Sequence, residues 1–129
     1  MSEPINDDGI QVKVEPYYLM DESDPEENRF VFSYTVTITN SGTSPTQLLS
    51  RHWIITNGDT MTTQEVKGQG VIGQQPQIQP GESYTYTSGT VMEAPVGTMH
   101  GSYHMVNADG TQFDVTIEPF MLAAPGNLH

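Results

Sequence analysis

Apolar residues recur at every second position along much of this chain. The pattern is clearest in residues 30–39, where polar side chains, mostly threonine, fill the intervening positions from residue 33 onward. The apolar positions of this segment are Phe30, Phe32, Tyr34, Val36 and Ile38. A period of two is typical of a strand with one buried and one solvated face, and threonine suits a pleated surface. Because no stretch has the period of an amphipathic helix, we predict an all-β fold.

Two further segments alternate in the same way, and in each the phase slips by one residue at a proline. The first slip, at Pro16, places Tyr17 and Leu19 on the apolar face. The second, at Pro119, places Phe120 there. A slip of one residue at a proline is what a β-bulge on an edge strand leaves in a sequence. We therefore expect bulges on two edge strands.

Four more strands are expected between these segments, at residues 47–56, 60–66, 82–89 and 101–107. The dipeptides Asn57-Gly58 and Asp109-Gly110 are typical of tight hairpin turns. Roughly seven or eight short strands with frequent turns predict an antiparallel β-sandwich, with a closed barrel as the alternative.

The length of 129 residues suits one domain. We expect a flexible tail at residues 1–8, a single β-sandwich domain at 9–125 and a second tail at 126–129. The acidic run at residues 21–27 lies between the first two expected strands and is interpreted as a solvated loop.

Charge and composition exclude several classes of function. Four Lys and Arg against sixteen Asp and Glu give a net charge of −12, which argues against nucleic acid and anionic membrane surfaces as partners. We interpret the acidic composition as serving solubility. The alternative interpretation is a cationic or metal-linked partner. The absence of cysteine removes disulfides, thiolate catalysis and Cys-ligated metal. With neither a signal peptide nor a long apolar run, the chain is expected in the cytoplasm.

Gly68, Gly70 and Gly73 match the pattern G-x-G-x-x-G. Dinucleotide binding through that pattern needs a helix opening on the last glycine, and the prolines at positions 76 and 80 prevent a regular helix there. We interpret the glycines as shaping a tight loop. The alternative is a nest of backbone N–H groups that binds a phosphate, with Lys67 beside it.

No catalytic residues, cofactor or metal site are predicted. His100 and His104 are four residues apart, which on a strand is about 13 Å and too far for one metal ion. Gly81-Glu82-Ser83-Tyr84-Thr85 lacks the final glycine of a nucleophile elbow. We therefore expect a protein that is not an enzyme.

The tripeptide Arg51-His52-Trp53 is the other candidate site. Trp53, the single tryptophan, is expected in the core. Arg51 would share its face and would then need either a carboxylate partner, for which Glu65 is the candidate, or a place near the strand end. The alternative is an exposed Arg/Trp anchor for a protein partner.

Five segments together resemble the ApaG family. They are residues 48–56, 66–76, 80–89, 97–103 and 113–120, so the likeness extends over nearly the whole chain after about residue 9. Thr90-Val91 stands where many members have Cys-Pro. The resemblance implies a sandwich of the immunoglobulin or fibronectin type III kind, no established enzymatic activity and an association with cobalt and magnesium handling. It also implies use as an interaction module, and the family's glycine pattern has prompted a proposal of pyrophosphate or nucleotide binding.

The leading hypothesis is therefore a non-enzymatic module that binds a protein partner through an exposed sheet edge and the loop at residues 68–73. Binding of a phosphorylated small molecule, such as a nucleotide or pyrophosphate, through Gly68, Gly70, Gly73 and Lys67 is the alternative. Metal-dependent nucleotide hydrolysis ranks last, because no ligand cluster is visible. Pairing of two copies through sheet edges is a further hypothesis.

Overall fold

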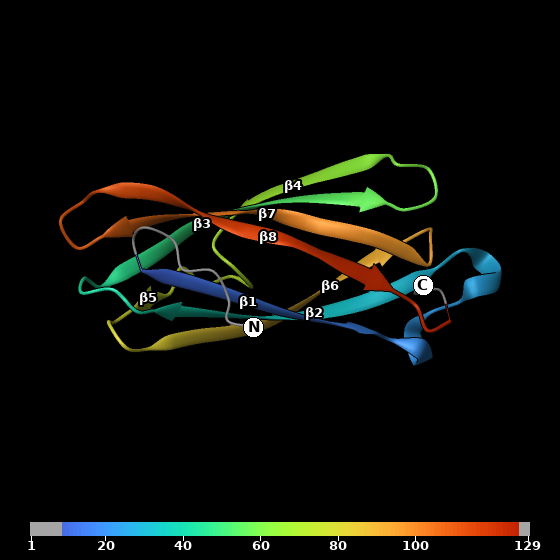
Figure 1. Cartoon of the computed structure of the whole chain (residues 1–129), viewed down its shortest axis with the longest axis horizontal. Coiled ribbons are helices and arrows are strands. Elements are labelled where there is room, and N and C mark those ends of the chain that lie inside the picture. The colour runs from blue at the N-terminus through green and yellow to red at the C-terminus, as the bar shows by residue number, and fades with distance from the viewer. Residues whose placement is uncertain (1–8, 127–129) are drawn as a thin grey trace.

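The computed structural model describes residues 9–126 of the chain. Within them, eight strands form two antiparallel sheets, which lie one over the other as two layers (Figure 1). The strands are β1 (Ile10–Tyr18), β2 (Phe30–Asn40), β3 (Thr46–Asn57), β4 (Thr63–Gln69), β5 (Gln77–Ile78), β6 (Ser83–Met92), β7 (Val96–Asn107) and β8 (Gln112–Ala123). Two short 3-10 turns, η1 (Met20–Glu22) and η2 (Pro25–Glu27), occupy the predicted acidic loop. The predicted tail at residues 1–8 and, apart from Gly126, the predicted tail at 126–129 lie outside the described residues.

The strand order is β1-β2-β6 in the smaller sheet and β4-β3-β7-β8 in the larger one, where β5 also pairs with β3. All neighbouring strands are antiparallel. The predicted β-sandwich is therefore confirmed, and the strand number is at the upper end of the expected range.

The core lies between the two sheets and is built from the alternate residues of each strand. On β2 every second residue from Phe30 to Ile38 is buried, as the period of two predicts. Trp53 of β3 is 2% exposed and lies at the centre of a group of aromatic rings. The rings of Tyr34, Phe120 and Tyr103 pack against it, with centroids 5.4, 5.9 and 6.3 Å away. Such tilted and edge-on contacts favour aromatic side chains over aliphatic ones at the centre of the sandwich.

The expected bulge at Pro119 is confirmed. Met99 of β7 pairs with Phe120 of β8, and Gly101 of β7 pairs with Ile117 of β8. Two residues of β7 therefore correspond to three residues of β8. The extra residue on β8 shifts the phase, so that Val115 and Ile117 before the bulge and Leu122 after it are all buried. β8 is an edge strand, where a proline costs no ladder hydrogen bond if its nitrogen faces solvent.

The expected bulge at Pro16 is wrong. β1 is an edge strand, but its register with β2 runs without a shift from Ile10 to Tyr18. Tyr18, whose ring centroid lies 5.5 Å from that of Phe32, packs on the core, and Tyr17 is 60% exposed. The alternation of β1 therefore continues unchanged through Pro16. The two successive tyrosines made both phases possible in the sequence, since either one could face inward.

Three strands differ in extent from the prediction by three residues or more. β6 ends at Met92, three residues later than expected. β4 begins and ends three residues later than the expected 60–66 segment, so that it includes Gly68. The turn before it is longer than the Asn57-Gly58 dipeptide suggests, because the Asn57 side chain accepts hydrogen bonds from the N–H groups of Asp59 and Thr60. β7 begins five residues earlier than expected, at Val96.

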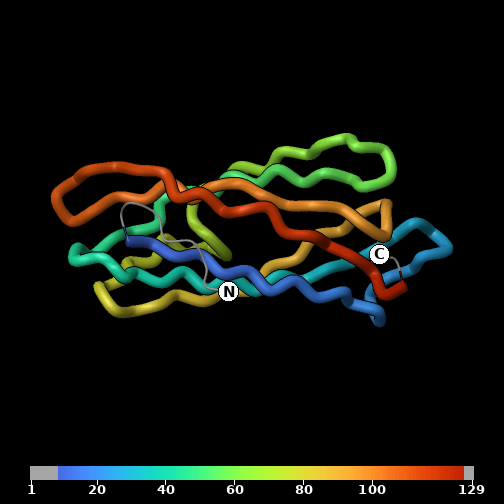
Figure 2. Tube along the Cα trace, in the orientation of Figure 1, coloured from blue at the N-terminus to red at the C-terminus, as the bar shows by residue number. Residues whose placement is uncertain are grey.

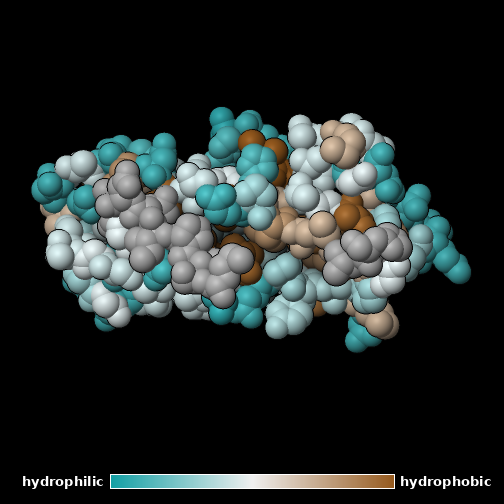
Figure 3. All heavy atoms as spheres, in the orientation of Figure 1, coloured by the Kyte–Doolittle hydropathy of each residue, from teal (hydrophilic) through white to brown (hydrophobic). Residues whose placement is uncertain are grey.

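The two long sides of the sandwich differ. On one side β1 and β8 lie against each other and close the gap between the sheets. On the other side the outer strands are β4 and β6, and the β3–β4 hairpin projects away from the smaller sheet (Figure 2). The surface drawn in Figure 3 is mostly polar, and its apolar side chains gather in the right-hand half of the view. No helix in residues 9–126 is long and apolar enough to cross a membrane.

Candidate functional site

The three glycines of the G-x-G-x-x-G pattern have different surroundings. Gly68 lies within β4, opposite Arg51. Gly70 and Gly73 have positive φ angles of 64° and 79°. Ile72 and Gly73 are the two central residues of a tight turn, across which Val71 and Gln74 exchange hydrogen bonds of 2.8 and 2.9 Å. No helix follows, since the chain continues into β5.

The backbone donors around these glycines are largely used within the fold. The N–H of Gly70 donates to the carbonyl of Leu49, and those of Val71 and Gln74 donate to each other's carbonyls. An anion nest requires N–H groups that are free to converge on a ligand. The turn therefore offers little to a phosphate. Lys67 lies on the outer face of β4 beside Glu65, with Nζ 3.8 Å from Oε1.

The side chain of Arg51 occupies the space beside Gly68. Its Nη1 donates hydrogen bonds to the carbonyls of Gln69 and Gly70, at 3.1 and 2.8 Å. A Cβ on Gly68 would lie only 2.8 Å from the guanidinium group. Gly68 thus leaves room for the Arg51 side chain, which in turn holds the carbonyls at the start of the turn.

The expected Arg51–Glu65 ion pair is wrong. The β3–β4 register places Glu65 opposite Ile54 and Arg51 opposite Gly68, on different faces of the sheet. Glu65 instead contacts His52, with 2.8 Å between Oε2 and Nε2. The alternative of an exposed Arg/Trp anchor also fails, because Trp53 is in the core.

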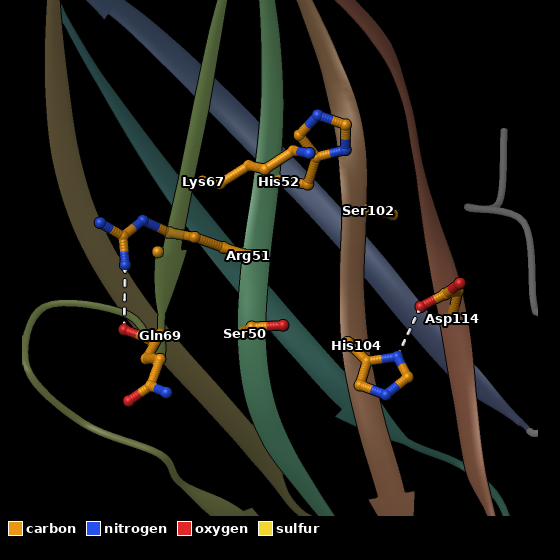
Figure 4. A pocket seen from close by; sticks show the side chains of 9 residues that line it. Ser50, Arg51, His52, Lys67, Gln69, Ser102, His104 and Asp114 are labelled. Carbon is orange, nitrogen blue, oxygen red and sulfur yellow. Dashed lines mark hydrogen bonds and ion pairs between the residues drawn. The ribbon is translucent and has the colours of Figure 1, made fainter.

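A shallow depression of about 440 Å³ lies on the outer face of the larger sheet (Figure 4). His52 and Lys67 lie close together at one end, His104 and Asp114 at the other, and Arg51 points away from them. The lining includes Ser50, His52, Lys67, Ser102, His104 and Asp114. These residues come from four strands, so only the strand order and register bring them together.

The charged pairs of this depression perturb two pKa values. His104 contacts Gln112 Oε1 through Nε2 and Asp114 Oδ1 through Nδ1, both at 2.7 Å. These two acceptors, Gln112 first, raise the pKa of His104 above its usual 6.5. The hydrogen bond from His52, followed by the charge of Lys67, lowers the pKa of Glu65.

His104 does not provide a general base for a nucleophile on this face. Ser50 lies opposite His104 in the β3–β7 register. Both ring nitrogens of His104 are already engaged with acceptors, which favours the doubly protonated imidazolium. A base must have a free lone pair to take a proton. His100 lies further along the same strand, opposite Ile54, and within residues 9–126 no three His, Asp or Glu side chains converge to hold a metal ion.

A second candidate surface is the free edge of β6. This strand pairs with β2 on one side and with no described strand on the other. Its ten residues contain no charged residue and no proline, and its register with β2 runs without a bulge. The other outer strands each have a protecting feature. β1 contains Lys13 and Pro16, β4 contains Lys67, and β8 has the bulge at Pro119.

Two hollows lie along this edge, between β6 and β4. The first, of about 320 Å³, has Trp53, Ile55, Val66 and Met99 in its lining, with Ser88, Gly89 and Thr90 at its β6 side. The second, of about 240 Å³, shares Ile55 and Gln64 with the first and continues past Val91 to Glu93. An exposed sheet edge is predicted from the sequence, but that prediction names no strand. The uncharged, proline-free run at residues 83–92 could have identified it.

Comparison with known proteins identifies the family. The family model of the ApaG domain matches residues 20–107. The chain is 61% identical to protein ApaG of Ectopseudomonas mendocina and 58% identical to that of Pseudomonas entomophila, each over 120 residues that cover 93% of this chain and 94% of the relative. A crystal structure of a Bordetella pertussis protein named ApaA has 48% sequence identity and a TM-score of 0.90, covering 96% of this chain and all of that one. The chain therefore belongs to the ApaG family.

Proposed function

We propose that this chain is a non-enzymatic protein-interaction module that accepts an extended segment of a partner as an additional strand beside β6. The observation that carries the proposal is the unprotected edge of β6. A free edge presents a row of backbone donors and acceptors, and natural proteins normally protect such edges with lysine, proline, bulges or coverage. β6 has none of the first three and pairs with no described strand on that side, whereas β1, β4 and β8 each have at least one.

The hollows beside β6 support the same function. In strand addition, backbone hydrogen bonds supply affinity and pockets for alternate side chains supply specificity. A strand added to β6 would extend the smaller sheet beneath β4, so its inward side chains would face the two hollows.

The competing hypotheses have less support. The donors of the 70–74 turn are engaged within the fold, which weakens phosphate binding through the glycines. The link to cobalt and magnesium handling and the cytoplasmic location stay predictions. The engaged nitrogens of His104 argue against its use as a general base.

Two proline substitutions test the proposal. The N–H groups of adjacent strand residues point to opposite sides. Of Thr87→Pro and Ser88→Pro, one therefore breaks the ladder with β2 and lowers the melting temperature, and the other removes only an outward N–H. The variant that keeps the melting temperature is called the edge variant below.

The edge variant is compared with the wild type in a pull-down from extract of the cells that make the protein. We expect proteins enriched by the wild type to be lost with the edge variant and kept with alanine at the same position, because alanine retains the N–H. Equal enrichment by the wild type and the edge variant would contradict the proposal.

A further inference from the structure

Resting on this proposed function, we infer that the segment accepted by β6 belongs to a different protein, has basic residues at both ends, and has an apolar side chain in its middle. The inference follows from the charges at the two ends of β6 and from the spacing of the two hollows.

Acidic side chains flank β6 at both ends. Glu82 precedes the strand, Glu93 follows it, and both are exposed. One Glu82 oxygen accepts a hydrogen bond of 3.3 Å from the N–H of Gln79. The other oxygen has no described partner. A segment that spans the whole of β6 therefore ends beside a carboxylate at each end.

These carboxylates disfavour a second copy of the chain. Full antiparallel overlap of two β6 strands would bring Glu82 of each copy within about a residue of Glu93 of the other. Like charges facing each other across strands are destabilising, and each copy carries a net charge of −12. Lysine or arginine at the ends of a partner segment would instead form opposite-charge pairs at both ends. The charge pattern thus favours a basic partner over self-association.

The hollows indicate the middle of the segment. The first borders Ser88, Gly89 and Thr90, and the second borders Val91 and Met92 of β6 and Glu93 just after it. Side chains two residues apart on a strand are about 6.8 Å apart and face the same side. Two inward side chains of one segment can therefore enter both hollows.

The two hollows differ in lining, since Asn57, Thr62, Thr63 and Gln64 make the second one mainly polar. The first hollow has more apolar side chains and therefore suits an apolar side chain of the partner. Trp53, Val66 and Met99 contribute to it, and Arg51 also borders it. The guanidinium of Arg51 is already bonded to two backbone carbonyls, so it does not require an acidic side chain from the partner.

Three synthetic peptides as long as β6 test the inference. The first has lysine at both ends and threonine alternating with valine and leucine between them. The second has glutamate at both ends, and the third replaces valine and leucine by serine. Because Trp53 is the single tryptophan and lines the first hollow, its fluorescence reports occupancy.

We expect the lysine-ended peptide to bind about tenfold more tightly than the glutamate-ended one, since two end pairs change sign. The serine peptide should bind more weakly than the lysine-ended one, and the edge variant should lose binding. Glu82→Lys combined with Glu93→Lys should reverse the preference between the first two peptides. Sedimentation should show a monomer.

Equal binding of the lysine-ended and glutamate-ended peptides would overturn the inferred charge pattern. A wild-type dimer that the edge variant dissociates would show that a second copy is the occupant. Either result would leave strand addition at β6 intact. If none of the peptides changes the fluorescence, the inference fails, and the pull-down with the edge variant decides separately whether the proposed function survives.

Discussion

At the scale of single residues, two tyrosine hydroxyls link the sheets. Tyr86 of β6 and Tyr103 of β7 share a hydrogen bond in the core. Burial raises the pKa of both phenols, so both stay neutral at physiological pH. The pair is thus a neutral link between the smaller and the larger sheet.

Tyr103→Phe should lower the free energy of unfolding by about 1–3 kcal/mol, because it leaves the Tyr86 hydroxyl buried without its partner. Urea unfolding followed by Trp53 fluorescence measures the change. The double variant with Tyr86→Phe should recover part of the loss, since both polar groups are then removed. A double variant less stable than the single one would contradict this account.

Ile72 has the strained backbone of the glycine-rich turn. Its φ angle is 43° and its side chain is 57% exposed, so a β-branched residue occupies a left-handed conformation without being buried. Ile72→Asn should raise the free energy of unfolding by about 1 kcal/mol, because asparagine tolerates this conformation. Thermal unfolding checks this. A fall in stability would instead indicate that the isoleucine side chain contributes packing.

His104 should make the stability depend on pH. Its pKa is raised in the folded state, chiefly by Gln112 and then by Asp114. The resulting stabilisation is fully present below the usual pKa of 6.5 and is lost as the pH rises through the raised value. NMR titration of the ring should therefore give a pKa above 6.5.

Asp114→Asn provides the control for that titration, because it removes the charge and keeps the shape of the side chain. The pKa of His104 should fall in this variant. An unchanged pKa would mean that Asp114 does not act on His104 as the contact implies.

At the scale of elements, β6 differs from the central strands of the larger sheet. β3 and β7 are paired on both sides over much of their length, whereas β6 is paired only with β2. Amide hydrogen exchange should therefore alternate along β6, slow where the N–H faces β2 and fast where it faces outward. In β7 it should be slow at successive residues. Uniform protection along β6 would contradict a free edge in solution.

The strands could largely be predicted from the sequence, because burial on one face enforces the period of two. The period of two does not, however, determine whether a strand has a bulge at Pro16 or Pro119. Pro119 is followed by a single aromatic residue, and the slip is real. Pro16 is followed by two tyrosines, and the packing of Tyr18 rather than Tyr17 against Phe32 decides the phase. Such a choice depends on the neighbouring strand.

The candidate sites depended on register, which the sequence did not determine. The strand after Asn57-Gly58 begins three residues later than predicted. The predicted ion pair of Arg51 and Glu65 is wrong because the register places them on different faces of the sheet. The contact between His104 and Asp114 joins β7 and β8, and it follows only from their pairing. The packing of Arg51 against Gly68 could not be predicted, because Arg51 comes from the neighbouring strand β3.

At the scale of the whole molecule, the sandwich is closed along β1 and β8 and open along β4 and β6. The open side combines a free edge, two hollows and acidic ends. The outer face of the larger sheet carries a polar depression instead. A chain with a net charge of −12 should attract a basic segment over a distance, and raised salt should slow that association.

The most direct test of strand addition is to map the binding of the lysine-ended peptide on the backbone amide resonances of the protein. The account predicts that the largest shifts occur in β6 and around Trp53 and Val66, and that outward amides of β6 become protected from exchange. Shifts centred on His52, Lys67 and His104 would contradict it, because they would assign binding to the outer face of the larger sheet.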